Sequence, residues 1–168
     1  MTQTLTARRL VTQLKRNGIT VGTAESCTGG QIAKAITDIP GSSAVLLGGF
    51  VTYTNAVKTA LLGVDPAIFA RDTEVSEACA VAMAQGALQR LGCDLAVSTT
   101  GYAGPGGGTE QNPVGTVYLA VASRCGVTTH RLSAPTDSTR RDVRTAATRC
   151  ALELLYTEAQ RLSASKIN

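Results

Sequence analysis

The chain has 168 residues and a mass of 17.3 kDa, a length typical of one domain. Hydrophobic residues make up 43% of it and charged residues 17%, which excludes an intrinsically disordered chain. Four Tyr, two Phe and no Trp argue against a protein that stacks single-stranded nucleic acid on aromatic rings. The net charge of +4 is compatible with an anionic small molecule as a ligand. No apolar run approaches the roughly 18 residues that a membrane-spanning helix requires.

The cysteines form no pair with metal-binding spacing. There are five of them: Cys27, Cys79, Cys93, Cys125 and Cys150. No C-x-x-C pair is present, so we expect no structural zinc, and nothing else in the chain indicates a metal or an organic cofactor. The odd number of cysteines and the absence of a signal peptide predict free thiols in a cytoplasmic protein.

Helical and strand patterns alternate through the first part of the chain. Leu5, Leu10, Val11 and Leu14 predict an opening helix that ends at Gly18. We then predict a strand over 19–24, a helix over 31–37, a strand over 44–54 and a helix over 56–62. The second strand is expected to be buried. The last of these helices is expected to have Asn55 as its N-cap and Gly63 as its C-cap.

The second part predicts a helix from its cap Ser76 to Leu91, a strand over 95–99 and a glycine-rich loop over 101–115. Two further strands, 116–122 and 127–132, are joined by a short turn that is typical of a β-hairpin. A long helix over 138–162 follows. This alternation favours a single-domain three-layer α/β/α sandwich over residues 1–168, and the hairpin makes its sheet mixed.

The first candidate site lies where the 19–24 strand gives way to a helix. Glu25, Ser26, Cys27 and Thr28 stand there, followed by Gly29 and Gly30. A helix N-terminus presents free N–H groups that stabilise an anion or an oxyanion, and glycines let a ligand approach the backbone. The alternative is structural: Ser26 or Thr28 caps the helix and the glycines only form a turn.

A second candidate follows the 44–54 strand, where Tyr53 precedes a helix whose first turn contains Lys58. The positive end of the helix dipole disfavours a cation there, so the lysine is expected to lose some proton affinity. Such a lysine can serve as a general base. In the alternative, Lys58 extends to solvent and Tyr53 belongs to the core.

Two more segments could bind a phosphate. The glycine-rich loop includes Gly101, Gly104 and Gly106 but lacks a P-loop or dinucleotide-binding pattern, so it is either functional or simply a flexible surface loop. Arg140 and Arg144 lie four residues apart on one helix face, where they bind an anion or form a solvated surface.

The chain contains one histidine, His130, in a predicted strand. A Ser-His-Asp triad or a two-histidine metal site therefore lacks suitable residues. If Ser26 is a nucleophile, its base is Lys58 or Tyr53, as in the serine–lysine variants of the triad. Cys27 is the rival nucleophile, because a helix N-terminus also stabilises a thiolate.

Taken together, these segments resemble the C-terminal domain of the competence/damage-inducible CinA family, which includes stand-alone nicotinamide-nucleotide amidases. The similarity runs over nearly the whole chain. Its marks are Thr23–Gly30, Pro40–Ser43, Gly48–Asn55 with Lys58, Leu62–Val64, Val75–Glu77, Gly101–Gly107 and Pro113–Val117. Where the family usually has Gly-Asp-Arg before its last helix, this chain has Ser138-Thr139-Arg140.

The resemblance implies a hydrolase that converts nicotinamide mononucleotide to nicotinate mononucleotide and ammonia on a three-layer fold. It implies Ser26 as the nucleophile, with Lys58 and Tyr53 activating it. The oxyanion would be bound by N–H groups from Thr28 to Gly30, and the ribose and phosphate by the 101–108 loop with Arg140. The chain has no room for the N-terminal nucleotide-processing domain of the larger family members, so the amidase domain alone is expected.

Two alternatives stay open. One is a non-catalytic domain that binds pyridine nucleotides, and the other is an amidase for a different small amide. The joint presence of Ser26, Tyr53 and Lys58 favours catalysis. The partner we expect is a small-molecule nucleotide rather than a nucleic acid or a membrane, and the Ala-rich helices make a homo-oligomer the expected assembly.

Overall fold

The computed structural model describes residues 2–164 and contains a five-stranded sheet in the order β2-β1-β3-β4-β5. The strands are β1 Val21–Glu25, β2 Leu46–Val51, β3 Leu95–Gly101, β4 Thr116–Ser123 and β5 Gly126–Ser133. Strand β1 runs parallel to both β2 and β3, whereas β4 runs antiparallel to both β3 and β5. The sheet is therefore mixed, as predicted.

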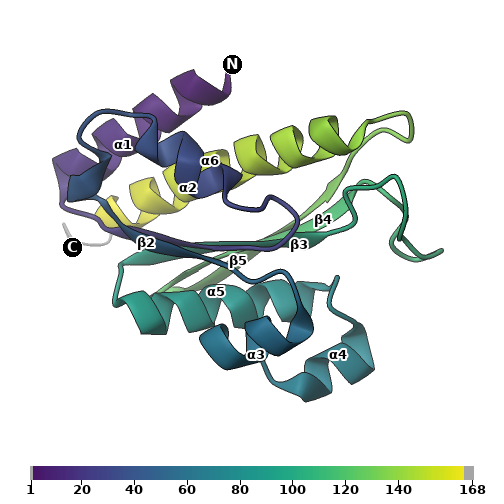
Figure 1. The fold of residues 1–168 in the computed structure, drawn as a ribbon. Coiled ribbons are helices and arrows are strands. Elements are labelled where there is room, and N and C mark those ends of the chain that lie inside the picture. Colours follow the sequence, from purple (N-terminus) through teal and green to yellow (C-terminus); the bar gives the residue numbers. More distant parts are fainter. Residues whose placement is uncertain (1, 165–168) are drawn as a thin grey trace.

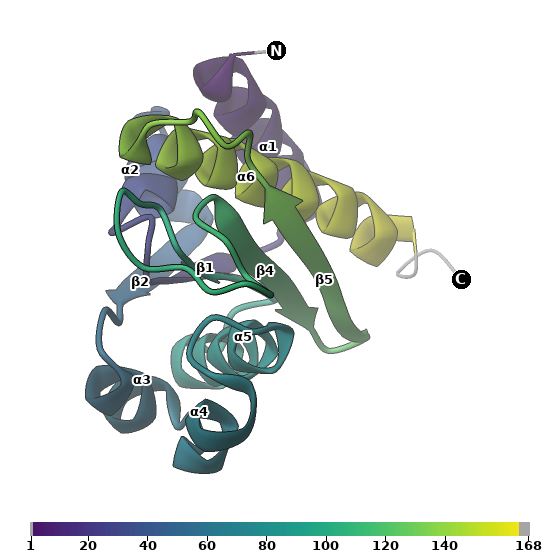
Figure 2. The same cartoon turned by 90° about the vertical axis from the view of Figure 1, so that its right-hand side faces the viewer.

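Helices cover both faces of this sheet (Figures 1 and 2). One face carries α1 Gln3–Asn17, α2 Gln31–Thr37 and α6 Arg140–Ala164, and the other carries α3 Asn55–Leu62, α4 Pro66–Asp72 and α5 Glu77–Leu91. A short 3₁₀ turn, η1 Ser42–Ala44, precedes β2. The predicted three-layer α/β/α sandwich is confirmed. Within residues 2–164, no helix combines the length and the apolar character needed to cross a bilayer.

Small residues let α5 pack closely against both the sheet and the helix next to it. Ala80 and Ala84 of α5 pack against Ala120 and Ala122 of β4. A methyl group added to Gly86 of α5 would meet the carbonyl oxygen of Leu62 at 2.0 Å, so only glycine allows this approach. Because Leu62 ends α3, this contact fixes the helix that carries Lys58.

Several predicted boundaries are confirmed by capping contacts. Gly18, Gly63 and Gly92 end α1, α3 and α5 in the left-handed conformation, and the Ser76 hydroxyl accepts a hydrogen bond from the Cys79 N–H. The N-cap of α3 is Thr54 rather than the predicted Asn55, since the Thr54 hydroxyl accepts from Val57 N–H. Helix α4 was not predicted at all.

The prediction of a buried strand over 44–54 is wrong. Strand β2 covers only residues 46–51, and it lies at the edge of the sheet with alternating half-buried and exposed residues. Leu47 and Val51 are 48% and 54% exposed. An apolar run of this length cannot distinguish a central strand from an edge strand.

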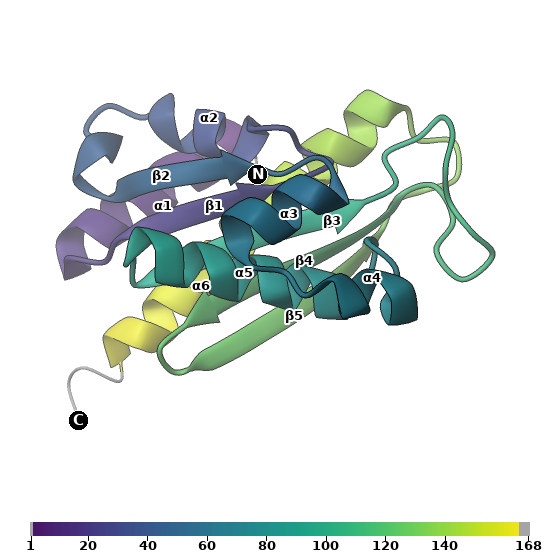
Figure 3. The ribbon, with the colours of Figure 1, turned by 60° about the horizontal axis from the view of Figure 1, so that its bottom comes forward.

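The parallel strands β1, β2 and β3 end on the same side of the molecule (Figure 3). The connection from β3 to β4, which contains the glycine-rich segment, extends from that side. In an open α/β sheet, ligands bind outside the carboxyl ends of parallel strands. The topology therefore brings Ser26, Tyr53 and Tyr102 to one end of the sheet.

Candidate active site

Ser26 stands directly after β1, at the start of the turn that leads into α2. Its N–H donates to the carbonyl of Thr99 in the neighbouring strand β3 at 3.0 Å, which continues the sheet pairing by one residue. The chain then reverses through Gly29 and Gly30, which have φ values of 60° and 93°. The serine side chain is only 8% exposed, and the turn holds it at the end of the central strand.

Lys58 reaches the same point from α3, and its side chain is buried, with 1% exposure. The Nζ atom lies 3.2 Å from Ser26 Oγ, 3.0 Å from the Thr52 carbonyl oxygen and 3.4 Å from the Tyr53 carbonyl oxygen. In the described part of the chain it forms no ion pair with a carboxylate within 4.0 Å. The predicted pairing of Ser26 with Lys58 is therefore present in the geometry.

Burial lowers the pKa of Lys58, because removing the ammonium from water disfavours its charged form. The opposing effects of Cys79 and then Glu74 are smaller. In the structure Nζ donates to the two backbone carbonyls and to Ser26 Oγ. A neutral amine has two N–H donors and one lone pair, so with both N–H groups held by the carbonyls its lone pair would face the Ser26 hydroxyl.

Cys27, the rival nucleophile, is 5% exposed. Burial raises the pKa of its thiol to about 11, with smaller opposing effects from its own backbone N–H and from nearby arginines. A thiol with that pKa is almost entirely protonated at neutral pH, and the thiolate is the nucleophilic form. The chemistry of the pair at this turn therefore favours Ser26.

Of the N–H groups predicted to bind the oxyanion, from Thr28 to Gly30, those of Gly29 and Gly30 already have acceptors. Gly29 N–H donates to the Ser26 carbonyl at 3.1 Å, and Gly30 N–H donates to the Glu25 carboxylate at 2.9 Å. The Thr28 hydroxyl donates to the same carboxylate at 2.7 Å. Further donors to it are Ile32 N–H at 3.1 Å and Ala33 N–H at 2.9 Å. The start of α2 is thus filled by a side chain of the protein itself.

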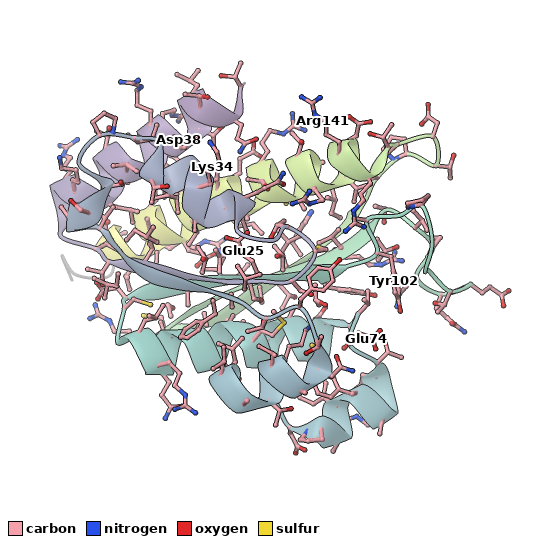
Figure 4. All side chains as sticks on the ribbon, viewed as in Figure 1. Glu25, Lys34, Asp38, Glu74, Tyr102 and Arg141 are labelled. Carbon is pink, nitrogen blue, oxygen red and sulfur yellow. The ribbon has the colours of Figure 1, made fainter. Side chains whose placement is uncertain are left out.

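Glu25 is fully buried, and Figure 4 shows it between α2 and the sheet. Its backbone carbonyl accepts from Thr52 N–H at 2.8 Å, and the carbonyl of Thr52 in turn holds Lys58. One residue therefore links the turn of the serine to the segment that holds the lysine. This role was not predicted, because Glu25 ends β1 and lies six residues before the first residue of α2.

The structure places Tyr53 differently from the prediction. Its side chain is 60% exposed, and its hydroxyl accepts a hydrogen bond from Arg140 Nη2 at 3.0 Å. In the described residues that hydroxyl contacts neither Ser26 nor Lys58, so the structure gives it no position for relaying their proton. The backbone carbonyl of Tyr53 is the group that contacts the lysine.

The two arginines of α6 have separate positions. Arg140 donates to the carbonyl of Gly104 at 2.8 Å as well as to Tyr53, and it lines the pocket beside the serine. Arg144 donates to the carbonyls of Cys27 and Thr28 at 3.1 and 2.9 Å, so it holds the turn that carries Ser26. Of the two, only Arg140 is placed to contact a ligand in this pocket.

These groups enclose a pocket of about 160 Å³. Its lining residues are Ser26, Cys27, Tyr53, Lys58, Glu74, Val75, Thr100, Gly101, Tyr102, Ala103 and Arg140. Of the predicted loop glycines, Gly101 lines the pocket and Gly104 contributes its carbonyl to Arg140, whereas Gly106 does neither. His130 lies on the edge strand β5, away from these lining residues.

Sequence reasoning missed Glu74, which lines the pocket from the connection between α4 and α5. No motif marks this residue. Tyr102, directly after β3, lies within the glycine-rich segment singled out from the sequence, but no role was predicted for its side chain. Over residues 2–164, no group of three or more His, Cys, Asp or Glu side chains is arranged to hold a metal ion.

The fold and the pocket define an α/β domain in which a serine, a buried lysine and an arginine gather at the carboxyl ends of parallel strands. A family model described as the CinA C-terminal domain matches residues 3–159 of this chain. The chain belongs to that family.

Relatives and solved structures agree with this assignment. A CinA-like protein from Mycobacterium marinum is 52% identical over 136 residues, which are 80% of this chain and 32% of the relative. One from Chlorobaculum tepidum is 53% identical over 68% of this chain and 27% of its own length. The chain thus spans about a third or less of these relatives.

The solved structures match along almost their whole length. The competence/damage-inducible protein CihA from Agrobacterium tumefaciens superposes with a TM-score of 0.89 at 47% identity, covering 92% of this chain and 94% of that one. A CinA superfamily protein from Klebsiella pneumoniae gives a TM-score of 0.91 at 32% identity, covering 96% and 99%.

Proposed function

We propose that this protein is an amidohydrolase that converts nicotinamide mononucleotide to nicotinate mononucleotide and ammonia, with Ser26 as the nucleophile. The observation that carries the proposal is the buried contact of 3.2 Å between Ser26 Oγ and Lys58 Nζ inside a pocket. The chain belongs to the CinA family, and its motifs resemble those of the stand-alone nicotinamide-nucleotide amidases in that family. This resemblance supports the choice of substrate.

In the first half-reaction, neutral Lys58 takes the proton of Ser26 as Oγ attacks the carboxamide carbon. The resulting ammonium then gives that proton to the leaving nitrogen, the C–N bond breaks, and ammonia departs from an acyl-serine ester. In the second half-reaction, Lys58 takes a proton from a water molecule that attacks the ester carbon. Returning this proton to Oγ releases the carboxylic acid and restores both residues.

With the Gly29 and Gly30 N–H groups engaged, we assign the oxyanion to the backbone N–H of Cys27. This residue lines the pocket, and among the described residues its N–H donates to no oxygen atom. The N–H of the residue that follows the nucleophile serves the same purpose in α/β-hydrolases. Such a donor stabilises the negative charge that develops on the amide oxygen.

The substrate's phosphate is assigned to Arg140. Its guanidinium has a planar set of donors suited to phosphate oxygens, and it lines the pocket next to the exposed Tyr53. The pocket volume of about 160 Å³ suits the nicotinamide end of the ligand, which leaves the ribose phosphate toward Arg140. A cytoplasmic location is part of the proposal, since the five cysteines are all free.

The test is ammonia release from nicotinamide mononucleotide by the purified chain without added metal. Release that is lost in Ser26→Ala supports the proposal. Tight binding of the mononucleotide without any release would instead support a non-catalytic sensor. Release from other small amides but not from the mononucleotide would assign the protein to a different amidase activity.

A further inference from the structure

Glu74 is a pocket residue that the reaction just described does not use. It lies between α4 and α5, half-buried, and lines the same pocket as Ser26 and Lys58. Its carboxylate accepts no hydrogen bond and forms no ion pair within 4.0 Å in the described part of the chain. A carboxylate in a small pocket that has no hydrogen bond or ion pair with the protein is available to a ligand.

The backbone around Glu74 is fixed by contacts on both sides. Thr73 has a φ of 68° and a ψ of 170°, a combination that a β-branched residue adopts only when its surroundings impose it. The Thr100 hydroxyl donates to the Glu74 carbonyl at 2.6 Å, and the Asn112 side-chain amide donates to the Val75 carbonyl at 3.1 Å. The glutamate is therefore attached to a rigid part of the pocket wall.

Tyr102 adds an aromatic ring to the same pocket. Figure 4 shows Tyr102 and Glu74 at the end of the sheet near the glycine-rich segment. The Tyr102 backbone is held by Thr116 and Gly115, and a methyl group at Gly107 would come within 3.0 Å of the ring. Burial and, to a smaller extent, Glu74 raise the pKa of Tyr102, so the ring is a neutral phenol at pH 7.

A carboxylate and an aromatic ring in one pocket are the groups that recognise an organic cation. On the basis of the proposed function, we propose that Glu74, with the ring of Tyr102, selects substrates whose ring carries a positive charge. The pyridinium ring of nicotinamide mononucleotide has a permanent positive charge next to the carboxamide. Its reduced dihydropyridine form has the same ribose phosphate and the same amide but a neutral ring.

Glu74 also acts on the lysine, because its negative charge favours the ammonium form of Lys58. Glu74→Gln therefore disfavours the ammonium, and a neutral Lys58 repels a cationic ring less, which would strengthen binding of the oxidised ligand. Loss of a carboxylate that recognises the ring charge weakens that binding. The two effects have opposite signs, so weaker binding of the oxidised ligand alone identifies recognition.

The experiment measures the dissociation constants of oxidised and reduced nicotinamide mononucleotide on Ser26→Ala protein, which cannot turn them over. Each dissociation constant is measured for two proteins, the Ser26→Ala variant and the double variant that also has Glu74→Gln. We expect Glu74→Gln to weaken the oxidised ligand roughly tenfold and to change the reduced ligand less than about twofold. Glu77→Gln removes the same charge from an exposed position of α5 and should change neither.

Equal weakening of both ligands, or no weakening of the oxidised one, would overturn the inference. Unchanged binding of the neutral ligand also shows that the variant is folded, and the thermal midpoint gives a second check. Because the assay measures binding, its result is independent of turnover. Absence of ammonia release by the unmodified protein would reject the amidase while leaving the role of Glu74 to be decided by these affinities.

Discussion

Arg140 and Tyr53, which are 87 residues apart in the chain, meet beside the pocket, with Arg140 Nη2 3.0 Å from the tyrosine hydroxyl. Since Nη1 of the same guanidinium donates to Gly104, the arginine connects α6, the glycine-rich segment and the end of β2. A phosphate that binds Arg140 must compete with two neutral acceptors. A charged acceptor forms the stronger hydrogen bond, so the exchange favours the phosphate.

Arg140→Ala should lower kcat/KM for the mononucleotide roughly tenfold or more, because it removes a charge-assisted contact with the phosphate. Slow turnover of free nicotinamide, which has no phosphate, should hardly change. Steady-state rates with both substrates measure this difference. If the unmodified protein uses both with equal kcat/KM, the phosphate contributes nothing and Arg140 has another role.

Tyr53→Phe should reduce kcat by less than about tenfold, because the lost hydroxyl contacts Arg140 rather than the serine or the lysine. A change in KM is expected, since Arg140 loses one of its supports. The resemblance to the amidases implied a direct part for this tyrosine in activating the nucleophile. A loss of kcat on the order of 10³-fold would restore that role.

Ser26→Ala should lose on the order of 10³-fold or more in kcat, as nucleophile deletions do. Cys27→Ala should keep most of the activity, because the buried thiol, with a pKa of about 11, supplies very little thiolate. The two variants alter neighbouring residues of one turn, so each serves as the control for the other. The opposite result would identify a cysteine amidase.

Lys58→Met should remove most of the rate together with the alkaline rise of kcat/KM. The pKa of Lys58 is lowered by burial, so kcat/KM of the unmodified protein should rise with pH through one ionisation below the ordinary lysine value of 10.5. Methionine keeps an apolar stem of similar size and has no amine. Normal turnover with the same pH profile would show that the lysine is only structural.

The same variant gives a second, independent readout in stability. Between the lowered folded-state pKa and the unfolded value, the unfolded chain binds a proton that the folded protein does not. The free energy of unfolding of the unmodified protein therefore gains a term that rises with pH across this window, and Lys58→Met lacks it. In urea titrations, the stability of Lys58→Met relative to the unmodified protein should be greatest at the acid end of the window and decrease toward pH 10.5.

Glu25→Gln should destabilise the protein by about 1–3 kcal/mol, because the amide NH₂ would face N–H donors at the start of α2. The turn that carries Ser26 should also lose its alignment, which lowers kcat. Asp38→Asn, which affects only the exposed pair with Lys34, is a matched control expected within about 0.5 kcal/mol. Equal stability losses in the two variants would contradict the role given to Glu25.

Sequence patterns predicted the elements whose boundaries depend on local chemistry. Ser76 and Gly92 delimit α5 as expected, because a hydroxyl cap and a left-handed glycine act on the residues next to them. Helix α4 was missed although Asp65 and Pro66 are a typical cap and first residue of a helix. The edge position of β2 could not be predicted, since the order of strands in a sheet does not follow from hydrophobicity along one strand.

The residues of the candidate site likewise fall into two groups, those that the sequence predicted and those that it did not. Ser26 and Lys58 stand at junctions between strands and helices, so local pattern and family resemblance both led to them. The use of the α2 N–H groups by Glu25 depends on how a side chain folds back across seven residues, from Glu25 to Ile32. Glu74 reaches the pocket from the connection between α4 and α5, which only the complete topology brings beside Ser26.

The parallel pairing of β1 with β3 also bears on how the chain acquires its pocket. The two strands are separated by about 70 residues, as the contact between Thr20 and Asp94 across 74 positions illustrates. Closing so long a loop is slow and entropically costly before the contacts it permits are made. The residues that line the pocket around Ser26 come from the chain between β1 and β3, from the segment after β3 and from α6. A partly folded chain therefore carries every one of these side chains without yet possessing the pocket they form.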